Sequence, residues 1–334
     1  MTEALIARRA LIGGLTATAF GAQGLAAQAA QPQGRMQVTL LGTGSPQLNP
    51  DRFGPSILVQ AGGLNLVFDA GRGCTIRLNQ VAVPLGQVHA TFLTHFHSDH
   101  LNGLPDLWMT SYIRSPYAAR TTPFRLYGPT GTDRIAKAMH ETFRDDVATR
   151  MADEGVTEAA TRIDAREFPE TGGLVFNESG VRVTAFQVEH GAKIHPSVGY
   201  RVDYAGRSVV LSGDTRFSPN LIAHARGVDL LVHEVCLIPK GAEKDPTAVA
   251  VQQHHTSPEE AGQVFTQARP RLAVYSHIVL VARPKLKTPT VEDVLALTRK
   301  TYKGPLTAGQ DLTRYTLDGA SVSGERLPMR VRPG

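Results

Sequence analysis

The densest group of potential metal ligands in this 334-residue chain lies in residues 94–100, which read THFHSDH. In extended backbone, side chains two residues apart point to the same side, so His95 and His97 can address one ion. If the chain then turns into a helix, Asp99 and His100 can face a neighbouring ion. Neutral imidazole and carboxylate are the ligands that zinc prefers outside thiolate sites. A surface loop rich in histidine is the alternative, and four candidate ligands within six residues favour a metal site.

Three further candidates each come directly after an apolar segment that we expect to be a strand: His190, Asp214 and His277. The end of a strand is a position where a rigid sheet holds a side chain in place. Each of these residues alone is more typical of a satisfied structural residue. Together with the segment 94–100 they indicate a metal centre.

The elements that must position these residues alternate between strands and helices. Apolar segments bounded by Gly, Pro or Asn predict strands at 36–41, 57–60, 64–69, 88–94, 124–127, 174–176, 181–188, 197–204, 207–212, 230–234 and 272–276. Helical patterns cover 104–114, 132–150, 258–268 and 291–301. Ser257, followed by Pro258 and Glu260, is typical of a helix start with a capping box. Two strand-rich groups with interspersed helices predict an α/β fold, a four-layer αββα sandwich.

The first residues do not fit this pattern and resemble an export signal. Arg8 and Arg9 precede a short run of small and apolar residues, and Ala27-Gln28-Ala29 offers the pattern that a signal peptidase recognises. Paired arginines before a weakly apolar run favour the twin-arginine pathway. An ordinary Sec signal or an uncleaved anchor is the alternative. We therefore expect residues 1–29 to be removed, leaving a periplasmic protein without a stable membrane span.

The rest of the chain, residues 30–334, shows no linker and no internal repeat, which predicts a single domain. The formal charge of +5 favours anionic small molecules slightly, and the basic residues form no tract typical of nucleic-acid binding. Cys74 and Cys236 are the two cysteines. They could pair in an oxidising compartment or remain buried thiols.

Residues 36–317 resemble the metallo-β-lactamase superfamily, and within it ribonuclease Z and the related arylsulfatases and phosphodiesterases. The motifs that carry the resemblance are LGTGSP at 41–46, FDAG at 68–71, THFHSDH at 94–100, GYR at 199–201, SGDT at 212–215 and GQDL at 309–312. The resemblance implies a first zinc held by His95, His97 and His190, a second held by Asp99, His100 and His277, and Asp214 bridging both. His195 competes with His190, but the third motif of the family places its histidine a short gap ahead of GYR. Manganese or iron would suit the same ligand types.

The implied chemistry is hydrolysis of an ester bond. Two metal ions that share a water lower its pKa, so that hydroxide forms near neutral pH. The resemblance makes Asp99 both a ligand and the group that orients this hydroxide. The zinc β-lactamases lack the bridging aspartate, so the presence of Asp214 argues against β-lactam hydrolysis.

A second pair of residues matches the ribonuclease Z pattern, Glu234 in LVHEV and His255 in HHTSP. The resemblance implies that Glu234 orients His255, which contacts the scissile phosphate and can protonate the leaving oxygen. A positioned acid is typically worth 10²–10⁴-fold in rate. A buried structural glutamate and a loop histidine are the alternative, and His254 is the neighbouring choice of register.

The resemblance is incomplete where ribonuclease Z carries a long arm that grips tRNA, because His190 and Asp214 are only 24 residues apart. With the export signal, this predicts no tRNA partner and a dizinc hydrolase of small anionic esters, either phosphodiesters or aryl sulfates. The alternatives are a lactone or thioester hydrolase, a ribonuclease Z-like endonuclease on RNA, and a non-catalytic zinc-binding protein. The resemblance is compatible with a homodimer, but the sequence shows no interface.

Overall fold

The computed structural model describes residues 34–319 and 321–328, all of which belong to one compact unit. None of the helices in this part of the chain is long and apolar enough to cross a membrane. The export signal predicted at residues 1–29 lies outside the described residues and stays a prediction.

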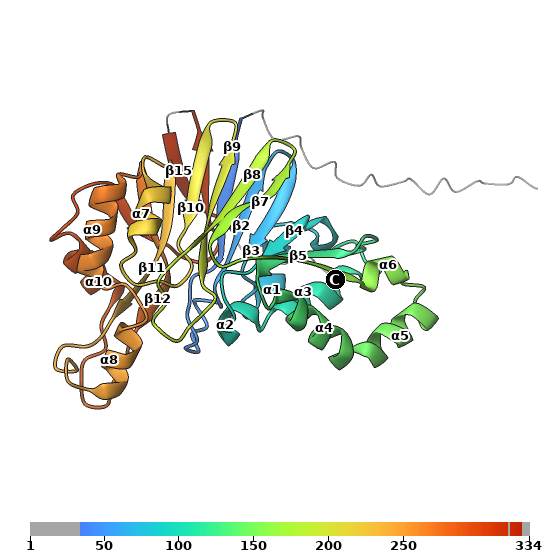
Figure 1. Ribbon diagram of the computed structural model, residues 1–334, viewed down its shortest axis with the longest axis horizontal. Helices are drawn as coiled ribbons and strands as arrows, with labels where there is room; N and C mark the ends of the chain where they lie inside the picture. The colour runs from blue at the N-terminus through green and yellow to red at the C-terminus, as the bar shows by residue number, and fades with distance from the viewer. Residues whose placement is uncertain (1–33, 320, 329–334) are drawn as a thin grey trace, which may run out of the picture. The chain divides into compact units, whose positions relative to one another are not determined.

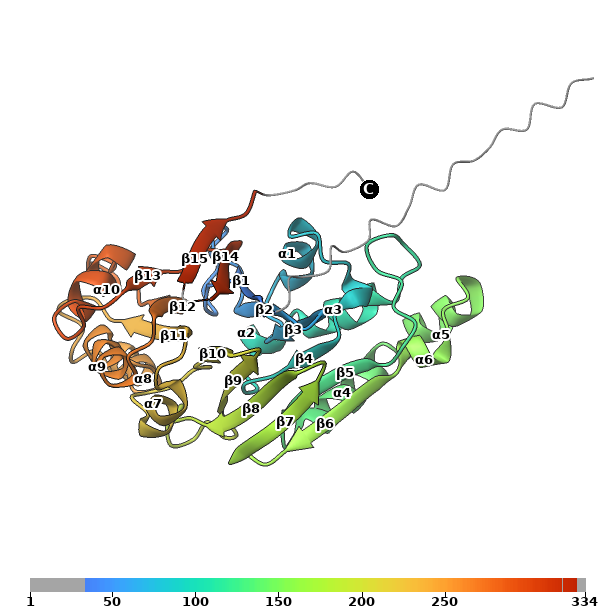
Figure 2. The same cartoon turned by 90° about the horizontal axis from the view of Figure 1, so that it is seen from above.

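Two mixed sheets form the centre of the fold (Figures 1 and 2). The first has the strand order β15-β14-β1-β2-β3-β4-β5-β6. Its strands are β1 (Met36–Gly42), β2 (Ser56–Ala61), β3 (Leu64–Phe68), β4 (Ala90–Phe92), β5 (Phe124–Pro129), β6 (Ile163–Phe168), β14 (Thr313–Asp318) and β15 (Ser321–Arg326). The second has the order β13-β12-β11-β10-β9-β8-β7. Its strands are β7 (Gly172–Glu178), β8 (Val181–Gln187), β9 (Val198–Tyr204), β10 (Arg207–Leu211), β11 (Leu230–Leu237), β12 (Leu272–Leu280) and β13 (Leu306–Ala308).

The two sheets pack face to face through one apolar cluster. Val38, Leu66 and Phe92 of the first sheet belong to the same buried cluster as Val183 and Val232 of the second. Apolar side chains on the inner face of each sheet leave water together, which is the main favourable term in such packing.

Strands β3 to β6 run parallel to one another, as do β10 to β13. Predicted site residues follow the ends of β4, β8 and β10 or lie within β11 and β12, where the β11–β12 pairing has an irregularity in register between His233 and Val235. The strand predicted over 272–276 continues to Leu280, so His277 lies inside β12 rather than after it, with a φ of 44°.

Helices cover the outer face of each sheet, which confirms the predicted four-layer αββα sandwich. On the first sheet the long helices are α1 (Cys74–Gln80), α3 (Leu104–Ser111), α4 (Thr132–Thr142) and α5 (Arg144–Asp153), with the single turns α2 (Ser98–Leu101) and α6 (Glu158–Thr161). On the second they are α7 (Pro219–Ala225), α9 (Pro258–Ala268) and α10 (Val291–Thr298), while α8 (Pro246–Gln252) projects below them in Figure 1. Buried side chains such as Leu107 and Trp108 of α3 and Val264 and Phe265 of α9 form the two outer clusters.

The local differences from the sequence predictions have physical causes. The helix predicted over 132–150 is two helices, because Phe143 has φ −107° and ψ 15° and the chain turns there. The predicted capping box at Ser257 is confirmed: its hydroxyl accepts from the Glu260 backbone N–H, and the Glu260 carboxylate accepts from the Ser257 N–H. Cys74 and Cys236 are both buried and unpaired.

Candidate active site

The first ligand segment follows the short strand β4 and runs into the helical turn α2. His97 is the N-cap of α2, with the extended backbone angles φ −65° and ψ 147°. The extended stretch places His95 and His97 together, and the helical turn directs Asp99 and His100 from its first residues. His95, Asp99 and His100 are buried, whereas His97 is exposed.

The structure brings all seven predicted ligands into two adjoining groups. Within each group the candidate ligand atoms lie within 4.8 Å of one another. The first group contains His95, His97, His190 and Asp214, and the second contains Asp99, His100 and His277. The segment 94–100, the ends of β8 and β10, and His277 within β12 thus meet at one place in the fold.

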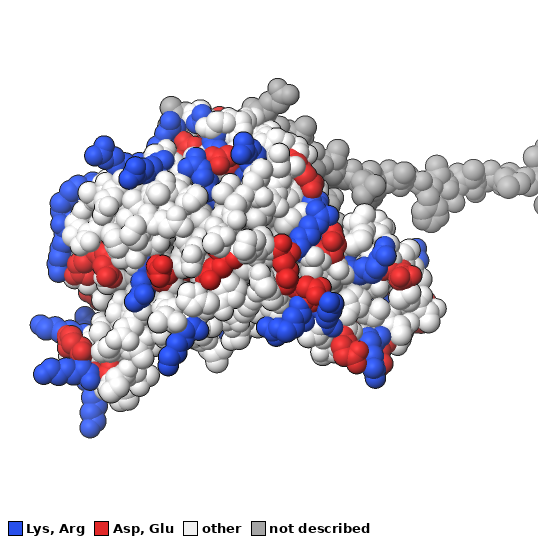
Figure 3. Space-filling model, viewed as in Figure 1, with Lys and Arg blue, Asp and Glu red and all other residues white. Residues whose placement is uncertain are grey.

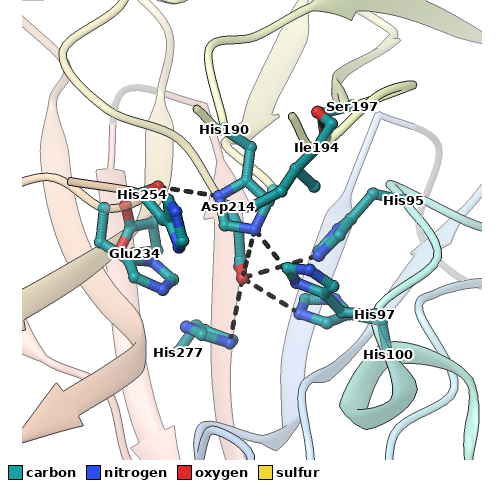
Figure 4. A network of polar contacts seen from close by, with 12 residues as sticks. His95, His97, His100, His190, Ile194, Ser197, Asp214, Glu234, His254 and His277 are labelled. Atoms are coloured by element: carbon teal, nitrogen blue, oxygen red, sulfur yellow. Dashed lines mark hydrogen bonds and ion pairs between the residues drawn. The ribbon is translucent and has the colours of Figure 1, made fainter. Parts of the chain in front are cut away.

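Asp214 lies at the centre of the two groups (Figure 4). The Oδ2 atom of Asp214 lies 3.7 Å from His95 Nε2, 3.4 Å from His100 Nε2, 3.7 Å from His190 Nε2 and 3.3 Å from His277 Nε2. Nitrogens from both groups therefore face a single carboxylate oxygen. This is the arrangement expected of a ligand shared between two ions.

The residues present fit a pair of metal ions. His95 Nε2, His100 Nε2 and Asp214 Oδ1 are buried and have no hydrogen-bond partner in the described part of the chain. Buried polar atoms in proteins are normally paired, and each exception requires an explanation. Cations bonded to these nitrogen and oxygen atoms would pair them, and such a donor set suits zinc, manganese or iron.

Further hydrogen bonds hold two of the ligand rings through Nδ1, the nitrogen that faces away from Asp214. Asp69 Oδ2 lies 2.8 Å from His100 Nδ1, and Asp69 Oδ1 accepts from the backbone N–H of Thr94 at 2.8 Å. On the other side of the site, His190 Nδ1 lies 2.8 Å from the backbone carbonyl oxygen of His254. A ring whose Nδ1 donates in this way presents the lone pair of Nε2 to a metal. Asp69 was not singled out from the sequence as a site residue, although the FDAG motif contains it.

Burial and neighbouring charges together set the protonation of the ligands. Burial lowers the pKa of His95 well below its usual value and lowers that of His190 to about 4. Burial also opposes the charge on Asp214, but the nearby His277 and His100 outweigh it and hold the pKa of Asp214 well below its usual value. Burial opposes the charge on His100 as well, but the Asp214 and Asp69 carboxylates raise the pKa of His100 well above its usual value, so this ring would lose its proton when a metal binds. Neutral imidazoles and an ionised carboxylate are the forms that bind metal.

Glu234 and His255 form the second predicted pair, next to the metal ligands. The Nδ1 atom of His255 lies 3.2 Å from Glu234 Oε2, and Glu234 Oε1 accepts from the Thr256 backbone N–H at 2.8 Å. A ring nitrogen of His255 lies within 4.8 Å of the ligand atoms of Asp214 and His277. Burial lowers the pKa of His255, but the Glu234 carboxylate overcomes this effect and raises the pKa to about 9.

The competing histidines lie outside both ligand groups. His195 is exposed, and its Nδ1 lies 2.7 Å from Glu170 Oε1. His254 contributes its backbone carbonyl rather than its ring. The remaining four histidines make local structural contacts, with Asn65 for His89, Trp108 for His140, Phe186 for His224 and Phe265 for His233.

Comparison with known proteins shows the family to which this chain belongs. The model of the beta-lactamase superfamily domain matches residues 64–278. Ribonuclease Z of Mycobacterium avium (strain 104) is 35% identical over 293 residues, which cover 86% of this chain and 100% of the relative. The chain belongs to the metallo-β-lactamase superfamily, on its ribonuclease Z branch.

Solved structures of this superfamily share the fold. The metallo-beta-lactamase fold protein YhfI from Bacillus subtilis has a TM-score of 0.64 at 17% identity, over 85% of this chain and 100% of its own. The short form of human tRNase Z has a TM-score of 0.58 at 22% identity, over 83% of this chain and 98% of its own.

The relatives correct two predictions made from the sequence. The preference for small phosphodiester or aryl sulfate substrates is wrong, and so is the expectation of no tRNA partner, because the full-length relatives carry the name ribonuclease Z. The short stretch from His190 to Asp214 had argued against that function. The match covers 293 residues and all of the Mycobacterium avium protein, so that relative contains no long segment that this chain lacks. The missing arm therefore does not separate this chain from proteins of that name.

Proposed function

We propose that this member of the superfamily is a metal-dependent endonuclease that cuts a phosphodiester bond of RNA, with precursor tRNA as its substrate. The observation that carries the proposal is the 35% identity to ribonuclease Z of Mycobacterium avium over the whole of that protein. The placement of Glu234 and His255 beside the metal ligands supports it, because RNA cleavage needs an acid for its alkoxide leaving group.

The two ligand groups would hold two zinc ions. His95, His97 and His190 would bind one, Asp99, His100 and His277 the other, and Asp214 would contact both. When bound, such a pair of ions supplies an acidified water and neutralises charge on the phosphate. Manganese or iron would suit the same nitrogen and oxygen atoms.

Side chains of this chain would orient the water and protonate the leaving oxygen. Asp99, whose Oδ2 lies 3.2 Å from His277 Nε2, is positioned to orient the attacking water by accepting its hydrogen bond. Glu234 holds Nδ1 of His255, which leaves Nε2 of that ring to give a proton to the leaving oxygen. Glu234 is itself fixed by the backbone N–H of Thr256, so the acid is oriented before the substrate binds.

The test is cleavage of a precursor tRNA with a 3′ extension by the zinc-loaded protein, compared with turnover of p-nitrophenyl sulfate and a homoserine lactone. The proposal predicts that the RNA is cut once and turned over most efficiently. Turnover of the sulfate or the lactone with intact RNA would overturn it.

A further inference from the structure

Two neighbouring loops form a projecting part of the surface that the proposed chemistry does not use. They comprise residues 238–253, which include α8, and residues 281–290, which follow β12; we call them the lysine lobe. In Figure 1, α8 projects from the body of the fold below α9 and α10.

Specific contacts join the two loops of the lysine lobe to each other. Asp245 caps α8 by accepting from the Ala248 N–H at 2.8 Å, and the same carboxylate oxygen accepts from Arg283 Nε of the second loop at 3.0 Å. The lobe also has a small apolar core, formed by Ala242, Ala248 and Val281 with Leu286 packed against it. One carboxylate and one cluster therefore fix both loops to each other.

Four exposed lysines lie on this lobe: Lys240, Lys244, Lys285 and Lys287. Among the described residues, none of them forms an ion pair. The two carboxylates of the lobe are engaged locally, because Glu243 accepts from the Gly241 backbone N–H at 2.9 Å and Asp245 bonds Arg283. Basic side chains project from this part of the surface in Figure 3.

The lysine lobe leads directly into the candidate active site. His254 and His255 follow α8 directly, and the His254 carbonyl bonds the ligand His190. The seven residues of α8 span roughly 10 Å, so the lysines near its start lie beyond the reach of a single scissile phosphate. A polymer cut at the site can contact both places at once, whereas a small ester cannot.

We propose that the lysine lobe binds backbone phosphates of the RNA on one side of the cut. This inference rests on the proposed function and adds where the substrate is held. Unpaired lysines on a fixed support attract a polyanion by releasing its counterions, independently of base sequence. Because each such contact binds the substrate rather than the transition state alone, the lobe would act mainly on KM.

The experiment compares two charge-reversal variants, Lys240→Glu/Lys244→Glu and Lys285→Glu/Lys287→Glu, with the unaltered zinc-loaded protein. Initial rates are measured on precursor tRNA and on bis(p-nitrophenyl) phosphate across a range of salt concentrations. The ratio of kcat/KM for RNA to that for the small diester is expected to fall roughly tenfold at low salt in each variant. The slope of log kcat/KM for RNA against log salt should become shallower by about 1 for each phosphate that the variant no longer binds.

The matched control is Arg182→Glu/Arg226→Glu, which makes the same change of charge elsewhere. Arg182 lies at the start of β8, whereas His190 follows the end of that strand. Arg226 precedes β11, and Glu234 lies in the middle of that strand. Both arginines are exposed and lie away from the site. The control should keep the RNA ratio and the salt slope of the unaltered protein. If the lobe variants match the control while RNA is cut, the lobe inference is wrong and the proposed function stands. If the unaltered protein cuts no RNA, both are overturned.

Discussion

Asp69 Oδ2 lies 2.8 Å from Nδ1 of His100, on the far side of a ring whose Nε2 faces Asp214. Asp69 also accepts hydrogen bonds from the backbone N–H and the hydroxyl of Thr94, so its own position is fixed. A carboxylate behind a ligand histidine sets the tautomer of the ring and increases its basicity. Asp69 is therefore a positioning residue for the second metal.

The variant Asp69→Asn should weaken binding of the second metal ion by about 10–100-fold, because the amide no longer holds His100 with a charge. Metal content per chain, measured after dialysis against a weak chelator, should fall from two towards one. Asp311→Asn is the control, since Asp311 is also buried and bonds Thr43 and Arg77 outside the site. Equal metal loss in both variants would contradict a specific role for Asp69.

A comparison of His190→Ala with His195→Ala tests the choice of third ligand in the first group. His190 lies among the candidate ligands, whereas His195 is exposed beside Glu170. We expect His190→Ala to lose about one metal ion per chain and His195→Ala to keep both. Metal analysis of the two purified proteins decides the question. Loss of metal in His195→Ala alone would reassign the ligand.

Replacement of His255 by Ala should lower kcat for RNA by about 10²–10⁴-fold while both metal ions remain bound. Glu234→Gln should cause a smaller loss, because the ring remains but its orientation and charge partner weaken. Single-turnover rates together with metal analysis give both quantities. A greater loss of kcat in His254→Ala than in His255→Ala would show that His254 is the acid instead of His255.

The two thiols should not react in the folded protein. Burial raises the pKa of Cys74 to about 12, and burial also raises the pKa of Cys236. At pH 8 both are therefore protonated, and the thiolate is the reactive form. A thiol-specific chromogenic reagent should detect no reactive cysteine before denaturation and two afterwards. Fast reaction of the native protein, or absence of thiols after denaturation, would contradict this structure.

The export prediction can be tested on the protein recovered from cells that express the full chain. Cleavage after Ala29 predicts a mature chain that begins at Ala30. Replacement of both Arg8 and Arg9 by Lys should prevent processing if the twin-arginine pathway is used. N-terminal sequencing and cell fractionation give the answer. If the unaltered protein keeps Met1, the prediction of a cleaved export signal is wrong.

The sandwich and the placement of the ligands could be predicted because the information is local. Buried strands such as β10 and β11 are short apolar segments; Asp214 follows the end of β10, and Glu234 lies within β11. The Ser257 capping box likewise marks the start of α9 within four residues. Short elements such as α8 carry too few residues for a periodic pattern to emerge, so the sequence does not predict them.

The substrate could not be predicted in the same way. The short segment between His190 and Asp214 shows only that the chain has no long arm at this place. It gives no information on the ligands that other surfaces of the fold bind.

Lys240 and Lys285 are 45 residues apart in the sequence. The bond between Asp245 and Arg283 and the apolar cluster around Ala248 and Val281 show that their loops form one unit. Scattered basic residues in a sequence therefore do not exclude a basic surface.

The most direct test of the central claim is cleavage of precursor tRNA in water enriched in ¹⁸O, with mass analysis of the product ends. Hydrolysis at the two-metal site predicts a terminal phosphate that carries one oxygen from the solvent, and loss of cleavage after metal removal with recovery on adding zinc. Uncut RNA, or products that end in a 2′,3′-cyclic phosphate without solvent oxygen, would contradict the account.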